Sequence, residues 1–194
     1  MDDVRIEAIG PEDPRFAEWH AAIVRSYAHG REPGWWESLA ATRIYFARVS
    51  AQKRHVALVA SLDGGVVGGA ELTLPLDADV ETMSVELGVL PDARGRGVGD
   101  ALLSAVRDVA TREDRHVLQA EVFVPADLGP DQWPGARFAE RHGLRCATVE
   151  HRFLLDVPVP DERLDDLAAG AEEGASQDDV IVSPRDQPRV RLRV

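Results

Sequence analysis

The residues whose types and spacing could do chemistry lie at positions 85–99, a segment rich in glycine and arginine. Four glycines within twelve residues let the backbone turn sharply and approach a ligand with no Cβ atom in the way. The helix predicted from residue 98 begins with unpaired backbone N–H groups and the positive end of its dipole. Arg94 and Arg96 add positive charge beside that helix end. This order of strand, glycine loop and helix is typical of a binding site for a phosphate-bearing cofactor.

Two other phosphate-binding patterns do not fit the segment. The P-loop requires a lysine followed by serine or threonine after its second glycine, and those residues are missing here. The dinucleotide fingerprint is GxGxxG, whereas residues 95–99 read GRGVG, which is one residue too short. Taken alone, the loop is compatible with anion binding and with a plain turn between strand and helix.

A wider comparison of motifs connects the segment to a family. Residues 94–99 read R-x-x-G-x-G with Pro91 upstream, and this run resembles the acyl-CoA pyrophosphate loop of the GNAT (GCN5-related) N-acetyltransferase superfamily. The resemblance extends over residues 1–156. It includes a hairpin at 55–60 and 66–74, a strand at 117–124 and a late helix within 136–144. It implies an α/β fold with a mixed, mostly antiparallel sheet and helices on both faces, the acyl-CoA N-acyltransferase fold.

Periodicity of the apolar residues predicts the other elements. Residues 4–9 alternate like a half-buried strand, and Asp63-Gly64 favours a hairpin turn. Helices are expected over 11–25, 37–51 and 135–142 and from residue 98, with further strands over 84–90, 145–149 and 151–155. Residues 157–194 form an acidic C-terminal extension, predicted to be disordered or to begin a truncated second domain.

The resemblance assigns a set of residues to the donor, acetyl-CoA, which would be a cosubstrate. Backbone groups of the strand before the loop would bind the pantetheine, the loop would bind the pyrophosphate, and one aromatic residue on the late helix would contact the same cofactor. These residues are, in that order, Leu87, Val89 and Leu90; Arg94, Gly95, Arg96, Gly97, Val98 and Gly99; and Phe138.

Glu86 is the first candidate for the general base that removes the ammonium proton of an acceptor. It lies on the strand leading to the loop, between apolar neighbours, and a buried carboxylate with a raised pKa suits a general base. Glu71 and Glu121, on neighbouring predicted strands, are alternatives. For any of the three, an exposed face or a structural ion pair is the competing interpretation.

The sequence departs from the family where many members carry a tyrosine that protonates the leaving thiolate. Phe138 is followed by Ala139, and Tyr27 and Tyr45 both lie in the first half of the chain. Water or a group on another strand could act instead, the thiolate could leave unprotonated, or catalysis could be lost. Cys146 fits a buried, inert thiol better than an acyl-carrying nucleophile.

Trp35 and Trp36 follow a Pro-Gly pair between the first two predicted helices. In members of the family this region lines the acceptor side, so the two rings are candidates for binding a hydrophobic or cationic acceptor. The alternative is an apolar plug that covers the core beneath a loop.

Composition limits the classes of partner. A hydrophobic content of 44% predicts a soluble globular protein, and no apolar run is long enough for a membrane span. The formal net charge of −12 argues against nucleic-acid binding and is compatible with a cationic amine. One cysteine and six histidines without ligand spacing give no metal site. The acidic N-terminus has no signal-like apolar core, which favours a cytoplasmic location, and a homodimer is one compatible assembly.

Two functions follow as expectations. The first is an N-acetyltransferase that moves an acetyl or acyl group from CoA to the amine of a small molecule or peptide by direct attack. The alternative is a catalytically weak acyl-CoA-binding or regulatory domain, half of a tandem protein. The intact loop is compatible with both, and Ala139 favours the second.

Overall fold

The computed structural model describes residues 3–30, 36–125, 127–152, 164 and 187–193. The chain divides into two compact units, Met1–Glu121 with Leu192–Val194, and Val122–Arg191.

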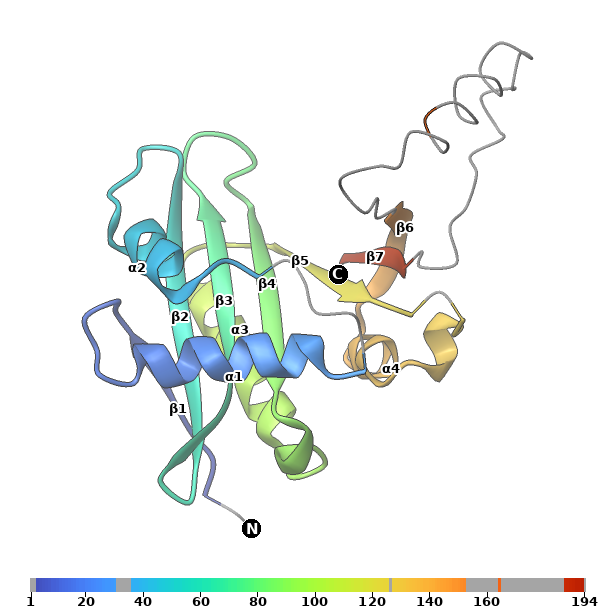
Figure 1. The fold of residues 1–194 in the computed structure, drawn as a ribbon. Coiled ribbons are helices and arrows are strands. Elements are labelled where there is room, and N and C mark those ends of the chain that lie inside the picture. Colours follow the sequence, from blue (N-terminus) through green and yellow to red (C-terminus); the bar gives the residue numbers. More distant parts are fainter. Residues whose placement is uncertain (1–2, 31–35, 126, 153–163, 165–186, 194) are drawn as a thin grey trace. The chain divides into compact units, whose positions relative to one another are not determined.

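The first unit is built on a sheet in which neighbouring strands follow the order of the chain (Figure 1). Its strands are β1 (Arg5–Ile9), β2 (Lys53–Leu62), β3 (Gly65–Pro75), β4 (Thr82–Val89) and β5 (Val117–Phe123). The first four pair antiparallel, and β5 runs parallel to β4. The predicted mixed, mostly antiparallel sheet is therefore confirmed.

Helices cover both faces of this sheet, as predicted. Figure 1 shows α1 (Phe16–Ala28) crossing one face and α3 (Val98–Arg112) behind the other. The shorter α2 (Leu39–Ala47) contacts α1 through Phe46, whose ring lies 5.3 Å from that of Phe16. One face of α3 is buried, with Leu102 and Val106 fully enclosed.

Two helix boundaries differ from the prediction for local reasons. α1 begins at Phe16 rather than at residue 11, because the Asp13 carboxylate accepts a hydrogen bond from the Arg15 backbone N–H at 2.8 Å and holds the preceding turn. α2 begins after Ser38, whose hydroxyl accepts from the backbone N–H of Ala41 at 3.2 Å.

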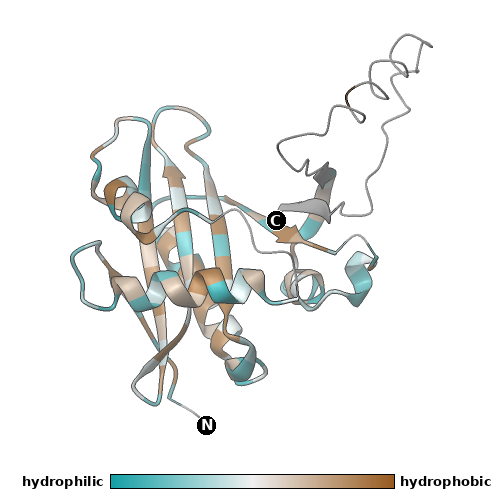
Figure 2. Ribbon diagram, viewed as in Figure 1, coloured by the Kyte–Doolittle hydropathy of each residue, from teal (hydrophilic) through white to brown (hydrophobic). Residues whose placement is uncertain are grey.

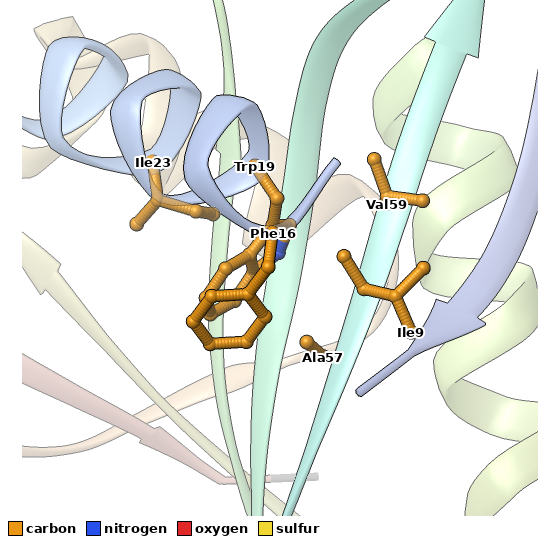
Figure 3. Packing of buried hydrophobic residues seen from close by; sticks show 6 residues of the cluster. All are labelled: Ile9, Phe16, Trp19, Ile23, Ala57 and Val59. Atoms are coloured by element: carbon orange, nitrogen blue, oxygen red, sulfur yellow. The ribbon is translucent and has the colours of Figure 1, made fainter. Parts of the chain in front are cut away.

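The close approach of α1 to the sheet depends on two glycines that face it. A Cβ atom at Gly69 would lie 2.7 Å from the Leu58 carbonyl oxygen and closer still to the Trp19 ring. A Cβ atom at Gly88 would collide with the Ser26 hydroxyl. The absence of these side chains lets Trp19 bury completely against the strands, in the cluster drawn in Figure 3.

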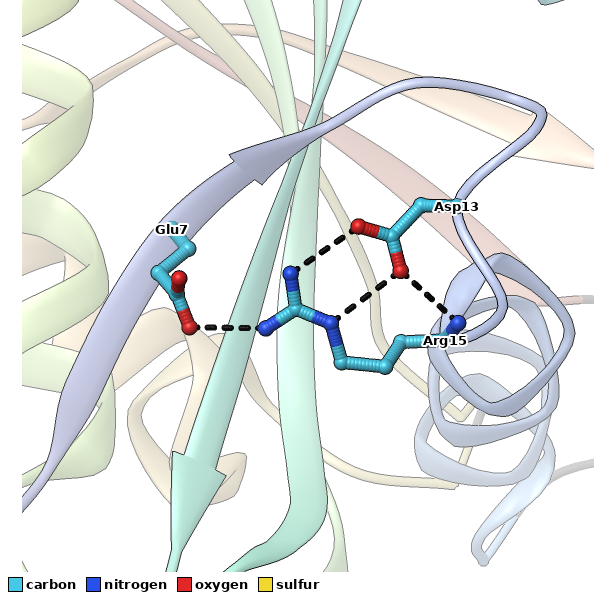
Figure 4. A network of polar contacts seen from close by, with 3 residues as sticks. All are labelled: Glu7, Asp13 and Arg15. Atoms are coloured by element: carbon cyan, nitrogen blue, oxygen red, sulfur yellow. Dashed lines mark hydrogen bonds and ion pairs between the residues drawn. The ribbon is translucent and has the colours of Figure 1, made fainter.

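A polar network ties β1 to the start of α1 (Figure 4). Arg15 bridges two carboxylates, with Nη1 2.7 Å from Glu7 Oε2 and Nη2 2.9 Å from Asp13 Oδ2. The Arg15 side chain holds the pKa of Asp13 below its ordinary value. The network fixes where the chain turns from the edge strand into the helix that covers the sheet.

The second unit contains α4 (Pro134–Arg141), β6 (Arg145–Arg152) and most of β7 (Gln187–Arg193), and β6 and β7 are neighbouring strands. The two strands predicted over 145–149 and 151–155 begin as one strand, since β6 continues through residue 150. Cys146 is exposed, so the expectation of a buried thiol was wrong. Most of the extension 157–194 lies outside the described residues. In the described residues, every helix is too short or too polar to span a bilayer.

Substituting Gly69→Ala should destabilise the fold, because a core this tightly packed cannot accept the added carbon without shifting Trp19 or the β2 backbone. We expect a loss of about 1–3 kcal/mol in the free energy of unfolding, measured by urea denaturation. Gly10→Ala is the matched control, because a Cβ atom there would meet nothing within 4 Å. Equal stability of the two variants would contradict the packing argument.

Candidate active site

Strand β4 loses its neighbour on one side partway along its length. Its pairing with β5 ends at Val85 and Ala120, whereas β4 continues to Val89. The backbone N–H of Leu90 donates to the Val67 carbonyl on β3 at 2.9 Å. Since backbone groups alternate along a strand, Leu87 and Val89 direct theirs to the other side, past the last β5 partner. Two of the three residues predicted for the pantetheine thus have backbone groups on this edge.

The loop after β4 requires glycine at two positions. A short 3-10 helix (Pro91–Ala93) is followed by Gly95 with φ +75° and Gly97 with φ +82°, both in the left-handed region. Gly97 is also the N-cap of α3, so the first backbone N–H groups of that helix point out of its end. A Cβ atom at either glycine would meet nothing within 4 Å. The backbone conformation, rather than crowding, selects glycine here, and the helix end has the donors that a diphosphate needs.

The two arginines of the loop have different surroundings. The Arg94 guanidinium donates to the carbonyl of Val89 at 3.1 Å and to that of Ser26 at 3.4 Å, and burial lowers the pKa of Arg94. Arg94 therefore connects the loop to β4 and to α1. Arg96 is exposed and forms an ion pair with Asp63, in the β2–β3 turn, at 3.2 Å. Sequence reasoning treated both as rim charges and missed the two carbonyl acceptors of Arg94.

Glu86, the predicted base, has its side chain on the face covered by α1. The Tyr27 hydroxyl donates to Glu86 Oε2 at 2.6 Å, and the Tyr27 ring lies 4.9 Å from that of Trp36. The predicted base and one predicted acceptor residue are thus joined through Tyr27. Trp35 lies outside the described residues.

Sequence reasoning did not include Tyr27 in the site, although a signal for it was present. Trp19, Ile23 and Tyr27 are spaced by four residues along α1 and so share one helix face. Trp19 and Ile23 are fully buried against the sheet, which directs Tyr27 to the same surface one turn further on. What the sequence did not reveal is that β4 presents Glu86 at that turn.

Glu71 occupies the position on β3 that is directly opposite Glu86 on β4. Residues opposed in this way share one face of the sheet, and Figure 2 shows hydrophilic patches side by side on the two strands. The Glu71 side chain is 13% exposed, and His55 Nδ1 lies 3.8 Å from its carboxyl. His55 also forms a hydrogen bond with the Thr73 hydroxyl at 3.1 Å and packs on the Tyr45 ring at 3.7 Å.

Burial separates the protonation states of Glu71 and His55. It raises the pKa of Glu71 from 4.5 to about 7, with Lys53 opposing the shift. It lowers the pKa of His55 from 6.5 to about 4, with a smaller contribution from Lys53. The carboxyl ionises only at a pH where the imidazole is already neutral, so the two groups do not form an ion pair despite their proximity.

The remaining predicted residues belong to other elements. Glu121, the other alternative base, directly follows the last residue of β5 that pairs with β4. Phe138 belongs to the second unit, where its ring lies 4.5 Å from that of His142 on α4. Ala139, at the family's tyrosine position, is buried. Within the described ranges, no group of three or more His, Cys, Asp or Glu side chains is arranged to hold a metal ion.

Comparisons with known proteins agree with this architecture. The family model of the acetyltransferase (GNAT) domain matches residues 53–144. A mycothiol acetyltransferase of Corynebacterium urealyticum is 31% identical over 126 residues, which are 63% of this chain and 34% of that protein. The chain thus spans about a third of the length of that curated relative.

Solved structures show the same fold. A tandem GNAT protein from the clavulanic acid biosynthesis pathway is similar with a TM-score of 0.64 and 26% identity, over 77% of this chain and 47% of that one. A putative acetyltransferase from Salmonella typhimurium, solved with its cofactor acetyl-CoA, has a TM-score of 0.61 and 16% identity, over 98% and 92% of the two chains. Residues 53–144 thus match the acetyltransferase (GNAT) domain, and the curated relative and the solved structures are similar to this chain in sequence and in fold.

Proposed function

We propose that the chain transfers an acetyl group from acetyl-CoA to an amine of a small molecule or peptide, by direct attack of the amine on the thioester. The observation that carries this proposal is that β4 has backbone groups directed to one side and a carboxylate side chain directed to another. Backbone groups of Leu87 and Val89 face the edge that β5 has left, while the side chain of the intervening strand residue Glu86 faces α1. Donor and acceptor sides would thus meet on one strand.

The donor side has features that fit a CoA thioester. The αL glycines 95 and 97 leave open space around the loop, and the first turn of α3 has N–H groups for a diphosphate. The Arg94 side chain donates to the Val89 carbonyl and so connects the loop to β4. This contact would fix the position of the proposed diphosphate-binding loop relative to the strand edge. When bound, acetyl-CoA would supply the acyl thioester that the amine attacks.

The acceptor side would remove a proton before attack. An alkyl amine is an ammonium ion near neutral pH, and the Glu86 carboxylate is the group that would take its proton, leaving the nitrogen lone pair free. Tyr27 fixes the direction of that carboxylate through its short hydrogen bond. Because no tyrosine follows Phe138, the leaving thiolate would depart unprotonated or take a proton from water, at little cost for a thiol whose ordinary pKa is near 8.5.

One observation favours the second candidate, an acyl-CoA-binding half of a tandem protein with little catalysis of its own. The chain corresponds to 47% of the length of the tandem GNAT protein that it resembles. The two functions differ in turnover and share donor binding. Two measurements distinguish the two functions. Calorimetry measures binding of acetyl-CoA, and an assay for release of the CoA thiol measures turnover with a panel of amines. Binding without turnover would favour the regulatory function, and failure to bind any CoA thioester would contradict both.

Glu86→Gln should lower the rate of acetyl transfer by about 100-fold or more, because glutamine cannot accept the ammonium proton. Acetyl-CoA affinity, measured by calorimetry, should stay within about twofold, since the changed side chain faces α1 and not the strand edge. Glu121→Gln is the control and should retain activity. The opposite result for the two variants would transfer the role of base to Glu121.

Gly97→Ala should weaken acetyl-CoA binding, because alanine disfavours the φ of +82° that turns the loop into α3. A strain of about 1–2 kcal/mol predicts a loss of roughly 5- to 30-fold in affinity by calorimetry, if the loop relaxes away from the binding conformation. Gly143→Ala introduces the same kind of strain at a φ of +85° in the second unit. Equal loss of affinity in both variants would indicate general destabilisation rather than a role for the loop.

A further inference from the structure

We propose that Tyr27 is a positioning residue that makes Glu86, rather than Glu71, the base of the reaction. The proposal rests on the proposed function, because it concerns the same proton transfer. It assigns separate roles to two carboxyl groups that the sheet places opposite each other, and it explains why a tyrosine on α1 contacts β4 at this position.

The two carboxyl groups start from equivalent positions. Glu71 and Glu86 are a directly opposed pair, with side chains on the same face and Cβ atoms typically about 5 Å apart in such pairs. Two like charges at this spacing disfavour simultaneous ionisation. The surroundings must therefore decide which group carries the charge at neutral pH.

Hydrogen bonding favours the charge on Glu86. The Tyr27 hydroxyl donates to its carboxylate at 2.6 Å, and a phenol that donates stabilises the ionised form more than the neutral acid. Tyr27 cannot move away easily, because Ser26 packs on Gly88 and the Tyr27 ring contacts Trp36. The donor is thus held over the carboxylate by the same helix packing that builds the core.

The surroundings of Glu71 favour its neutral form. Its side chain is mostly buried, and the nearby imidazole of His55 is neutral wherever the carboxyl can ionise. The charged and titratable groups near Glu71 are Lys53 and His55 on β2, Tyr45 on α2 and Glu86 on β4. Lys53 alone favours the ionised form, and it does not offset burial.

The decisive experiment compares pH profiles of kcat/KM for the amine that the panel identifies. In Tyr27→Phe, the acid limb should move up by about one pH unit, because the lost hydrogen bond had stabilised the ionised carboxylate. The rate should fall by up to about tenfold at pH values below the acid limb and by less at pH 7, with the KM for acetyl-CoA unchanged. Tyr45→Phe is the matched control for loss of a phenol hydroxyl, and it should move the acid limb much less than Tyr27→Phe does, since the Tyr45 ring packs on His55 and Phe46.

A double variant tests the competition between the carboxyl groups. Glu71→Gln removes the opposing acid, so Tyr27→Phe combined with Glu71→Gln should recover part of the loss and return the acid limb toward its original position. A purely structural role for Tyr27 predicts additive losses. Additive losses, or an acid limb that Tyr27→Phe does not move, would overturn the proposal.

Unfolding measurements test the same assignment without turnover, and so distinguish its failure from failure of the proposed function. Between pH 4.5 and 7 the native state holds a proton on Glu71 that the unfolded chain has released, so burial of this group costs stability as pH rises. Relative to the unmodified chain, Glu71→Gln should therefore gain stability across this range, and the opposite trend of His55 cancels because both proteins contain it.

The corresponding measurement for Tyr27 has the opposite sign. The hydrogen bond to an ionised Glu86 should stabilise the unmodified chain relative to Tyr27→Phe at pH 7, and this advantage should shrink as acid protonates the carboxylate. A stability difference between Glu71→Gln and the unmodified chain that is independent of pH, or a Tyr27→Phe deficit that is equal at pH 7 and pH 4, would overturn the proposal even if no amine were acetylated.

Discussion

The distance between α1 and the sheet is the constraint on which the remaining structure depends. Because Gly69 and Gly88 have no side chains, α1 packs closely on the strands. Trp19 fills the space over Gly69, and Ser26 packs on Gly88. This close packing lets the Ser26 carbonyl accept a hydrogen bond from Arg94, and it brings the next residue, Tyr27, within hydrogen-bonding distance of Glu86. The hydrophobic core and both polar sides of the site thus share one geometric cause, which is close packing at backbone level.

Much of this could be predicted from the sequence because it is written in local patterns. Alternation located the strands, the spacing of apolar residues located α3, and the glycine-arginine run located the left-handed turn before it. Glu86 could be nominated because its strand leads into that turn. Errors at helix ends arose where single side chains, such as Asp13 and Ser38, end the preceding turn by hydrogen bonding.

The rest depends on contacts between residues far apart in the chain. Tyr27 and Glu86 are separated by 59 positions, and Ser26 and Arg94 by 68. No local pattern encodes which residue of a helix meets which residue of a strand, because this depends on register and on the depth of packing. The surroundings of Glu71 were hidden for the same reason, since the pairing of β2 with β3 brings His55 beside it.

The alternation along β4 has a consequence for how such a protein can change over evolution. Leu87 and Val89 direct their backbone groups to the edge of β4 that lies beyond its last pairing with β5. The Cα substituents of Glu86 and Gly88, in contrast, face α1. Inserting or deleting one residue would exchange these assignments in the part of the strand beyond the change. The proposed donor and acceptor sides of β4 therefore depend on the same alternation. A point substitution could alter one of these proposed sides alone, whereas a one-residue change in the length of β4 would disturb both.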